Sequence, residues 1–217
     1  MTEHGYTVEA VKPEDHDEIM RLLKMTFYLD EPLNHTVGLG ADCSELDQFC
    51  GSSLLEGLSF KAVDREGNVA GVIISGVCPL DANVIEEMQN HTKNCKNPKF
   101  QKILYILTQR EIGSRLWEKY PEETQFVEIK VTATHVPWRK KGIMNALVAR
   151  TELAVKERGI RLLRLDTSSA YSAKSAERLG FNSVYTELYS NIKMDGKPVI
   201  VPPPPHLEDK VYLKVLY

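Results

Sequence analysis

The fold is decided by the stretch Thr132-Ala133-Thr134-His135-Val136-Pro137-Trp138-Arg139-Lys140-Lys141-Gly142-Ile143-Met144. Apolar and polar residues alternate over 126–134, which predicts a strand that ends within this stretch. Apolar residues then recur at helical spacing to about residue 158, where Gly159 can end a helix. A strand, a short basic loop and the start of a helix therefore follow one another.

The loop has the properties of an anion site. The first N–H groups of a helix have no partner within the helix, and the helix dipole adds partial positive charge there. Gly142 lets the backbone approach an anion closely, and Arg139, Lys140 and Lys141 add positive charge. This arrangement suits a pyrophosphate. A solvated basic turn before an ordinary helix would have the same residues, because short basic loops are common.

Other elements are predicted on both sides of this stretch. We expect strands at residues 6–11, 60–63, 69–77, 162–166, 183–190 and 210–216, and helices at about 13–30, 44–55, 98–117 and 172–179. Residues 79–97 are polar and irregular, and they belong to an inserted loop–helix region at about 79–120. This order predicts an α/β (α+β) fold, one domain over residues 1–217, with helices on both faces of the sheet.

Composition and charge exclude several function classes. The 217 residues are 42% hydrophobic and carry a net charge of -3, whereas a nucleic-acid-binding chain is usually strongly basic. No apolar run is long enough for a membrane span, and the opening segment MTEHGYTVEA has no apolar signal region.

The four cysteines, Cys43, Cys50, Cys78 and Cys95, lack zinc-site spacing, so we expect no metal. We expect a cytoplasmic monomer with reduced thiols and with neither nucleic-acid nor membrane partners.

The basic loop also resembles a known motif. Arg139-Lys140-Lys141-Gly142-Ile143-Met144 resembles the pyrophosphate-binding R-x-x-G-x-G/A motif of the GNAT acetyltransferases, although Lys140 and Met144 replace a common glycine and a small residue. Residues 132–137 resemble the family's strand, whose backbone binds the pantetheine arm of acetyl-CoA. Glu177-Arg178-Leu179-Gly180-Phe181 matches the family's E-K-L-G-F ending. The resemblance implies a mixed, mostly antiparallel sheet, with acetyl-CoA as co-substrate in a cleft between the Thr132 strand and the Leu162 strand.

Further segments resemble one branch of that family, the insect arylalkylamine N-acetyltransferases. They are Phe27-Tyr28-Leu29-Asp30-Glu31-Pro32-Leu33-Asn34, Asn97-Pro98-Lys99-Phe100-Gln101-Lys102-Ile103-Leu104, Ser168-Ser169-Ala170-Tyr171-Ser172-Ala173 and Pro205-His206. This resemblance implies transfer of acetyl to the primary amine of an arylalkylamine. The absence of a cysteine from residues 126–190 favours direct attack in a ternary complex. Dopamine, octopamine, serotonin and tryptamine stay open as acceptors.

The resemblance also implies the catalytic residues. Glu31 is the candidate general base, since the matching glutamate has that role in the insect enzymes and an ammonium must lose a proton before it can attack. Ala176 stands where many GNAT enzymes have a tyrosine acid, and the branch implicates two serines instead, Ser168 and Ser172. The serines can equally cap the helix that starts near residue 172. A backbone N–H in 132–134 can stabilise the oxyanion.

Residues that contact the two substrates complete the expected site. The expected cofactor-binding residues are Thr132, Ala133, Thr134, Arg139, Lys140, Lys141, Gly142, Ile143, Met144 and Ser169. The expected substrate-binding residues are Tyr28, Asp30 and His206. His206 can instead be an exposed residue after the proline run. The aromatic residues Phe27, Tyr28, Tyr105 and Trp117 can line an arene pocket or belong to the core.

Three alternatives stay open. GNAT folds also serve polyamines and protein lysines, and a fold does not fix the substrate. A catalytically inactive acyl-CoA-binding module would keep Arg139 and Gly142 but lose the base. A ping-pong route would need an acyl-cysteine. No cysteine lies in residues 126–190, although a distant one can fold into the site.

Overall fold

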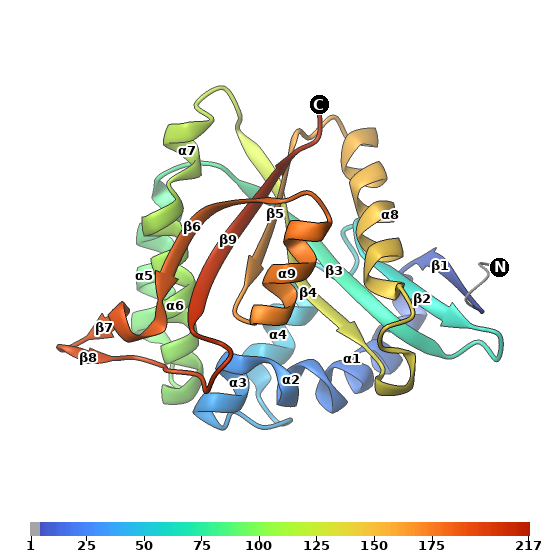
Figure 1. Ribbon diagram of the computed structural model, residues 1–217, viewed down its shortest axis with the longest axis horizontal. Helices are drawn as coiled ribbons and strands as arrows, with labels where there is room; N and C mark the ends of the chain where they lie inside the picture. Colours follow the sequence, from blue (N-terminus) through green and yellow to red (C-terminus); the bar gives the residue numbers. More distant parts are fainter. Residues whose placement is uncertain (1–4) are drawn as a thin grey trace.

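The computed structural model describes residues 5–217, so residues 1–4 of the opening segment lie outside the described residues. Its centre is a seven-stranded sheet in the order β1-β2-β3-β4-β5-β9-β6 (Figure 1). The strands are β1 (Tyr6–Ala10), β2 (Phe60–Asp64), β3 (Val69–Pro79), β4 (Gln125–Thr134), β5 (Leu162–Thr167), β6 (Asn182–Leu188) and β9 (Glu208–Val215), with β7 (Lys193–Met194) and β8 (Lys197–Pro198) forming a separate pair. β4 and β5 run parallel, and the other neighbours in the sheet pair antiparallel. The predicted mixed, mostly antiparallel sheet is confirmed.

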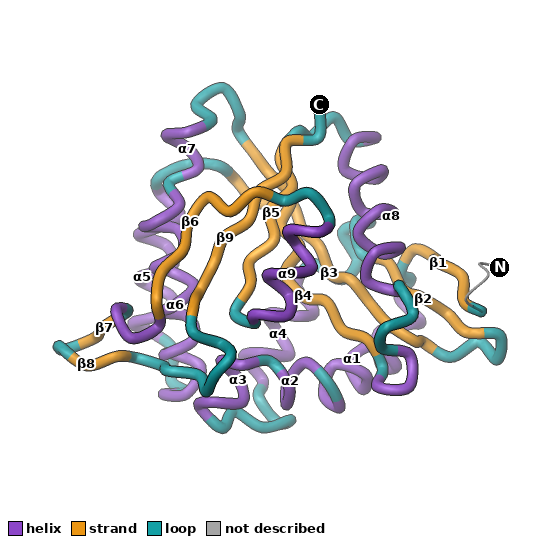
Figure 2. The backbone as a smooth tube through the Cα atoms, viewed as in Figure 1, coloured by secondary structure: helices purple, strands orange, loops and turns teal. Residues whose placement is uncertain are grey.

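Helices cover both faces of this sheet (Figure 2). They are α1 (His16–Met25), α2 (Phe27–Asp30), α3 (Pro32–Val37), α4 (Ser44–Ser52), α5 (Asn83–Asn94), α6 (Pro98–Ser114), α7 (Leu116–Lys119), α8 (Ile143–Glu157) and α9 (Ala170–Arg178), with short 3-10 turns at Pro13–Asp15, Val136–Trp138 and Tyr189–Asn191. One hydrophobic cluster joins α1, α3, α4 and α6 to β3 and β4. A second cluster joins α8 and α9 to the opposite face. The predicted placement of helices on both faces is confirmed.

A bulge in β4 divides a strand that the sequence predicts as one alternating face. Ile129 and Val131 pair with consecutive residues of β3, so Lys130 between them has no residue opposite it. Ile129 packs in the cluster under α8 and α9, whereas Val131 and Ala133 pack in the cluster under α1 and α6. An inserted residue bends the strand and increases its twist. The bulge therefore coincides with the point where β4 turns away from β5.

The helix predicted at 13–30 is interrupted. At Thr26 the backbone has φ of -130° and ψ of -82°, outside the helical region, and α2 begins only after it. The hydroxyl of Thr26 donates to the carbonyl of Leu22, which gives this residue a local partner. A further short helix, α3, starts at Pro32, a residue that suits the first helical position. The break turns the Glu31 segment across the end of the sheet (Figure 1).

The polar segment 79–97 contains a helix, α5, so the expectation of irregular structure is wrong there. α5 packs against α6, and the Thr92 and Thr108 hydroxyls lie 3.4 Å apart in that contact. Tertiary packing supplies most of the stability of such a helix, which composition alone does not reveal. The helix predicted at 98–117 ends at Arg115, whose positive φ of 43° separates α6 from α7.

None of the helices formed by residues 5–217 combines the length and the apolar character that crossing a membrane requires. All four cysteines fall in the described part of the chain, and each carries a free thiol. Cys43 and Cys50 are buried in the cluster that α4 shares with α1. Cys78 and Cys95 are half-buried.

Candidate functional site

β4 and β5 separate near the middle of the sheet and leave a cleft. In the described chain their parallel pairing covers only residues 127–129 and 163–165. Beyond Ile129 the backbone of β4 continues to pair with β3, so its other edge offers peptide groups to a ligand. A cavity of about 340 Å³ lies there, bounded by β4, β5, α2 and α9. The cleft predicted between these two strands is present.

The cleft brings together about half of the predicted cofactor-binding residues. Those that line it are Thr132, Ala133, Thr134, Arg139 and Ser169. An exposed strand edge of this kind fits an extended, amide-bearing chain such as the pantetheine arm. The start of α8 lies just beyond Arg139 in sequence, and its first N–H groups suit a phosphate. The geometry of the described residues thus fits an acyl-CoA.

The rest of the basic loop lies away from this cavity. The described residues that line the cleft do not include Lys140, Lys141, Gly142, Ile143 or Met144. Positive φ angles of 65° at Lys140 and 77° at Gly142 turn the loop into α8. The ammonium of Lys141 lies 4.3 Å from the centre of the Trp138 ring, and Ile143 is buried in the core. The anion role predicted from the sequence can therefore be filled by the backbone N–H groups at the start of α8 and by the exposed side chains of Lys140 and Lys141.

Arg139 and Asp30 form an ion pair at the edge of the cleft. Nη2 of Arg139 lies 2.6 Å from Oδ2 of Asp30, and both residues line the cavity. The Nε–H of Arg139 also donates to the carbonyl of Thr134 at 3.4 Å. Asp30 therefore lies in the cofactor cleft, which differs from its predicted role as an amine-binding residue. An anion that binds Arg139 must compete with this carboxylate.

Glu31 is fixed at the N-terminus of α3. Its backbone is extended, and its Oε2 accepts a hydrogen bond from the N–H of Asn34 at 2.7 Å, as an N-cap side chain does. Its Oε1 accepts a hydrogen bond from the hydroxyl of Ser168, which follows β5. Burial raises the pKa of Glu31, and the hydrogen bonds from Ser168 and Asn34 offset part of that rise. A carboxylate with a raised pKa is a stronger base than an ordinary glutamate.

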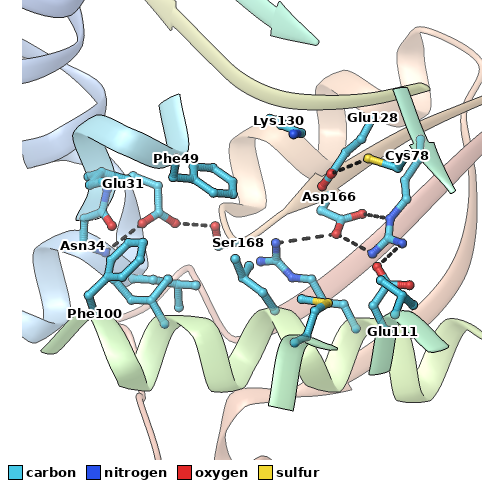
Figure 3. Close-up of a pocket in the computed structure, with 18 of the residues that line it drawn as sticks. Glu31, Asn34, Phe49, Cys78, Phe100, Glu111, Glu128, Lys130, Asp166 and Ser168 are labelled. Carbon is cyan, nitrogen blue, oxygen red and sulfur yellow. Dashed lines mark hydrogen bonds and ion pairs between the residues drawn. The ribbon is translucent and has the colours of Figure 1, made fainter. Parts of the chain in front are cut away.

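A second cavity, of about 300 Å³, meets the cleft at Glu31 (Figure 3). The residues that line both cavities are Phe27, Glu31, Lys130, Asp166 and Ser168. Aromatic side chains on its walls are Phe27, Phe49, Phe100 and Phe126. We call this second cavity the amine cavity, after the role proposed for it below; it shares the candidate base Glu31 with the cleft.

Three of the four aromatic residues considered from the sequence lie elsewhere. Tyr28 is fully buried in the core and donates to Asp47 at 2.7 Å, so its predicted role in substrate binding does not agree with its position. The hydroxyl of Tyr105 donates to the carbonyl of Lys193 at 2.8 Å, and Trp117 packs in a small separate cluster. The turn after Thr26 directs Phe27, rather than Tyr28, to both cavities. Adjacent residues of a helix point to different sides, so the direction of α2 decides which of the two aromatic side chains faces the cavities.

A buried charged network forms the floor of the amine cavity. Arg110 of α6 donates to both oxygens of Asp209, at 2.6 and 2.9 Å, and lies 3.7 Å from Asp166. Arg164 of β5 makes two hydrogen bonds of 2.8 Å with Asp166 and also pairs with Glu111. The network joins α6, β5 and β9, three elements that are distant in sequence. Sequence patterns gave no signal for it.

The two predicted serines have different surroundings. Ser168 contacts Glu31, as described above, whereas the hydroxyl of Ser172 donates to the carbonyl of Ser169 at 2.9 Å within the first turn of α9. The side chain of Ser169 caps that helix by accepting from the N–H of Tyr171. All three serines line the cleft: Ser168 donates to the candidate base, while Ser169 and Ser172 also bond within the helix start. The catalytic roles of Ser168 and Ser172 stay predictions.

His206 supports the same helix start. Its Nδ1 accepts a hydrogen bond from the N–H of Ala170 at 3.2 Å, and its ring packs edge-on against Tyr171. It lines neither the cleft nor the amine cavity among the described residues. Its position therefore favours a role in positioning α9 over the predicted contact with the amine.

A cysteine does fold into the site from a distant part of the chain. Cys78 of β3 lines the amine cavity. Burial raises the pKa of its thiol, and the nearby carboxylate of Glu128 raises it further. A thiol that resists ionisation is a poor nucleophile, so the position of Cys78 does not favour an acyl-cysteine.

Comparison with known proteins agrees with this geometry. No protein-family model matches the chain. Among solved structures, arylalkylamine N-acetyltransferase 2 from Aedes aegypti has a TM-score of 0.91 and 25% identity, with 98% of this chain and 99% of that chain covered. A Drosophila melanogaster polyamine N-acetyltransferase that forms N-acetylagmatine has a TM-score of 0.88 and 22% identity, covering 97% and 99%. The fold is that of the GNAT acetyltransferases, and the structure resembles an insect arylalkylamine N-acetyltransferase over nearly the whole chain.

Proposed function

We propose that the protein transfers the acetyl group of acetyl-CoA to a small primary amine in a ternary complex. The observation that carries this proposal is the junction of two cavities at Glu31 and Ser168. The cleft beside β4 suits the acetyl donor, and the amine cavity suits the acceptor. Glu31 lies where the two substrates would meet, and its raised pKa suits a base.

In the proposed reaction, Glu31, Ser168 and the open edge of β4 have different roles. The amine nitrogen forms a bond to the thioester carbonyl carbon, the carbon–sulfur bond breaks, and the amine proton is lost to a base while the thiolate leaves. Glu31 accepts the proton directly or through a water. Ser168 donates to Glu31 and holds its carboxylate in place. The open peptide edge of β4 supplies N–H groups for the carbonyl oxygen, and a thiolate with a pKa of ~8.5 leaves with little help.

Arylalkylamines are one candidate class of acceptor. The four phenylalanines on the walls of the amine cavity suit an aromatic ring. Aliphatic polyamines are the second candidate, because the same cavity carries more acidic than basic side chains. The acids are Glu31, Glu87, Glu111, Glu128 and Asp166, and the bases are Arg110, Lys130 and Arg164.

The proposal is tested by measuring free thiol released from acetyl-CoA with a panel of amines. The panel contains arylalkylamines, aliphatic polyamines and a lysine-rich peptide. Release with one or both classes of small amine is the expected result. Thiol release only with the peptide would overturn the proposed acceptor. If no amine gave thiol release while acetyl-CoA still bound, the protein would instead be an acyl-CoA-binding module.

Replacing Arg139 with alanine is expected to weaken acetyl-CoA binding roughly tenfold, because a charge-assisted contact with a phosphate is lost. Asp30→Asn is expected to have the opposite effect, since it frees the guanidinium from its 2.6 Å ion pair. Calorimetric titration with acetyl-CoA measures both. Arg150→Ala, which removes a half-buried guanidinium of α8 that does not line the cleft, should leave binding unchanged. Equal affinity in the Arg139 and Arg150 variants would contradict the pyrophosphate role.

Replacing Ser168 with alanine is expected to shift the pH profile of kcat/KM. The hydrogen bond from Ser168 lowers the pKa of Glu31, so its loss raises that pKa further. Because the ionised form of Glu31 is the base, the rise of activity with pH should move to higher pH. Ser172→Ala should leave the profile in place, since that hydroxyl bonds to Ser169. If the pH profile shifted only in the Ser172 variant, Ser172 rather than Ser168 would be the serine that acts on Glu31.

A further inference from the structure

Glu128, a carboxylate that lines the amine cavity, forms no ion pair with a basic side chain of the described residues. It accepts a long hydrogen bond of 3.7 Å from the thiol of Cys78. Burial raises the pKa of Glu128 and the neighbouring Asp166 adds to the rise, while the more distant charges of Arg164, Lys130 and Arg110 offset part of it. Because an unpaired buried charge is costly, a ligand that brings a cation to Glu128 gains stabilisation there.

The basic residues of the cavity are already engaged. Arg110 and Arg164 form the network of the floor, where each donates to other carboxylates. The ammonium of Lys130 donates to the hydroxyl of Ser53 at 2.7 Å. Three carboxylates that line the cavity form no ion pair with a described basic side chain: Glu31, Glu87 and Glu128. Glu87 is exposed on α5, so only Glu31 and Glu128 are half-buried.

These two carboxylates lie at opposite ends of the cavity (Figure 3). Glu31, Asn34 and Ser168 occupy one end, and Glu128 lies beside Cys78 toward the other. Glu128 is two residues before Lys130 on β4, about 7 Å along an extended strand, and Lys130 lines both cavities. An acceptor whose amine meets Glu31 can thus extend its far end along β4 toward Glu128.

We infer that Glu128 is a specificity-determining residue, and that the preferred acetyl acceptor carries a second cationic group at the far end of a short chain. Aliphatic diamines and aminoguanidines have this chemistry. A monoamine neutralises Glu31 alone and leaves Glu128 buried without a partner, whereas a dication pairs with both. The inference rests on the proposed function, because it assumes that an amine is acetylated beside Glu31.

The test compares acceptors of equal length. Cadaverine and hexylamine differ only in whether the far end is an ammonium or a methyl group, and phenethylamine represents the aromatic monoamines. With the native protein, kcat/KM for cadaverine should exceed that for hexylamine at least tenfold. Glu128→Gln should reduce this ratio to about threefold or less, while hexylamine and phenethylamine change little. Glu86→Gln removes the same formal charge from an exposed position on α5 and should keep the native ratio.

The outcomes separate this inference from the proposed function. A native preference for hexylamine or phenethylamine over cadaverine, or an unchanged ratio in Glu128→Gln, overturns the role of Glu128 while acetyl transfer stands. Absence of thiol release with all three amines overturns the proposed function and the inference with it. Activity of Glu128→Gln with hexylamine shows that this variant is folded, so a lower ratio of kcat/KM for cadaverine to that for hexylamine reports a change of specificity.

Discussion

Glutamine in place of Glu31 is expected to lower kcat about a hundredfold or more, because general-base catalysis contributes roughly 10²–10⁴. The amide oxygen can still accept the hydrogen bond that caps α3, so the local fold should persist. The amide cannot take a proton, however. Binding of acetyl-CoA should remain close to native, since the open edge of β4 and Arg139 are untouched. Steady-state turnover and acetyl-CoA titration measure the two quantities separately.

The pH profile gives this prediction a second readout. Burial raises the pKa of Glu31, so native kcat/KM should rise with pH through a value above that of an ordinary glutamate. That rise should be absent in Glu31→Gln, where only the titration of the amine remains. Glu66→Gln, in the exposed turn between β2 and β3, serves as the matched control. A Glu31→Gln protein with near-native turnover across pH would remove Glu31 from the role of base.

Replacing Arg110 with methionine is expected to lower the free energy of unfolding by about 3–5 kcal/mol, the usual cost of removing one partner of a buried ion pair. Asp209 is fully buried and loses both hydrogen bonds from the guanidinium, at 2.6 and 2.9 Å. The remaining hydrogen bond, from the hydroxyl of Tyr189, does not neutralise its charge. For a chain of this length such a loss lowers Tm by roughly 10 °C. Denaturant unfolding followed by fluorescence or circular dichroism measures it.

Two further variants test whether the loss of stability comes from the buried carboxylate of Asp209, which Arg110→Met leaves without its cation. Arg110→Met combined with Asp209→Leu removes both partners and should recover a large part of the lost stability, because apolar replacement of a whole buried pair is often nearly neutral. Arg115→Met breaks the exposed pair with Glu118 and should change stability by less than about 1 kcal/mol. If the Arg110 and Arg115 variants lost equal stability, the buried network would not hold α6 to β9.

Local sequence patterns predicted the parts of the site that are contiguous in the chain. The run from Thr132 to Arg139 reaches the cleft because a strand, its loop and the next helix need only neighbouring residues to form. The Glu31 segment was recognised in the same way, by a short motif around Pro32. The roles of these residues stay predictions, whereas the sheet and the cleft between β4 and β5 are confirmed.

Other features had no local signal. In the sequence, Glu128 is an ordinary polar position in an alternating strand. It lies in a cavity only because β4 has a bulge at Lys130 and because α5 and α6 pack over this part of the sheet. Tyr28 and Phe27 are adjacent aromatic residues, and the break at Thr26 decides which one reaches the cavity. Small changes in backbone direction are invisible to periodicity, which averages over a whole element.

By itself the sequence indicated the helices and strands, because alternation and helical spacing depend on neighbouring residues. The resemblance of its short motifs to the GNAT enzymes implied the mixed sheet, the position of the cleft and the candidate base. Only the tertiary structure decided which carboxylates are paired. Arg110 and Asp209 are separated by 99 positions, and Ser168 and Glu31 by 137. Such partners meet only when the sheet order brings α6, β5 and β9 together, and the same order leaves Glu128 facing the amine cavity without an ion pair from the described residues.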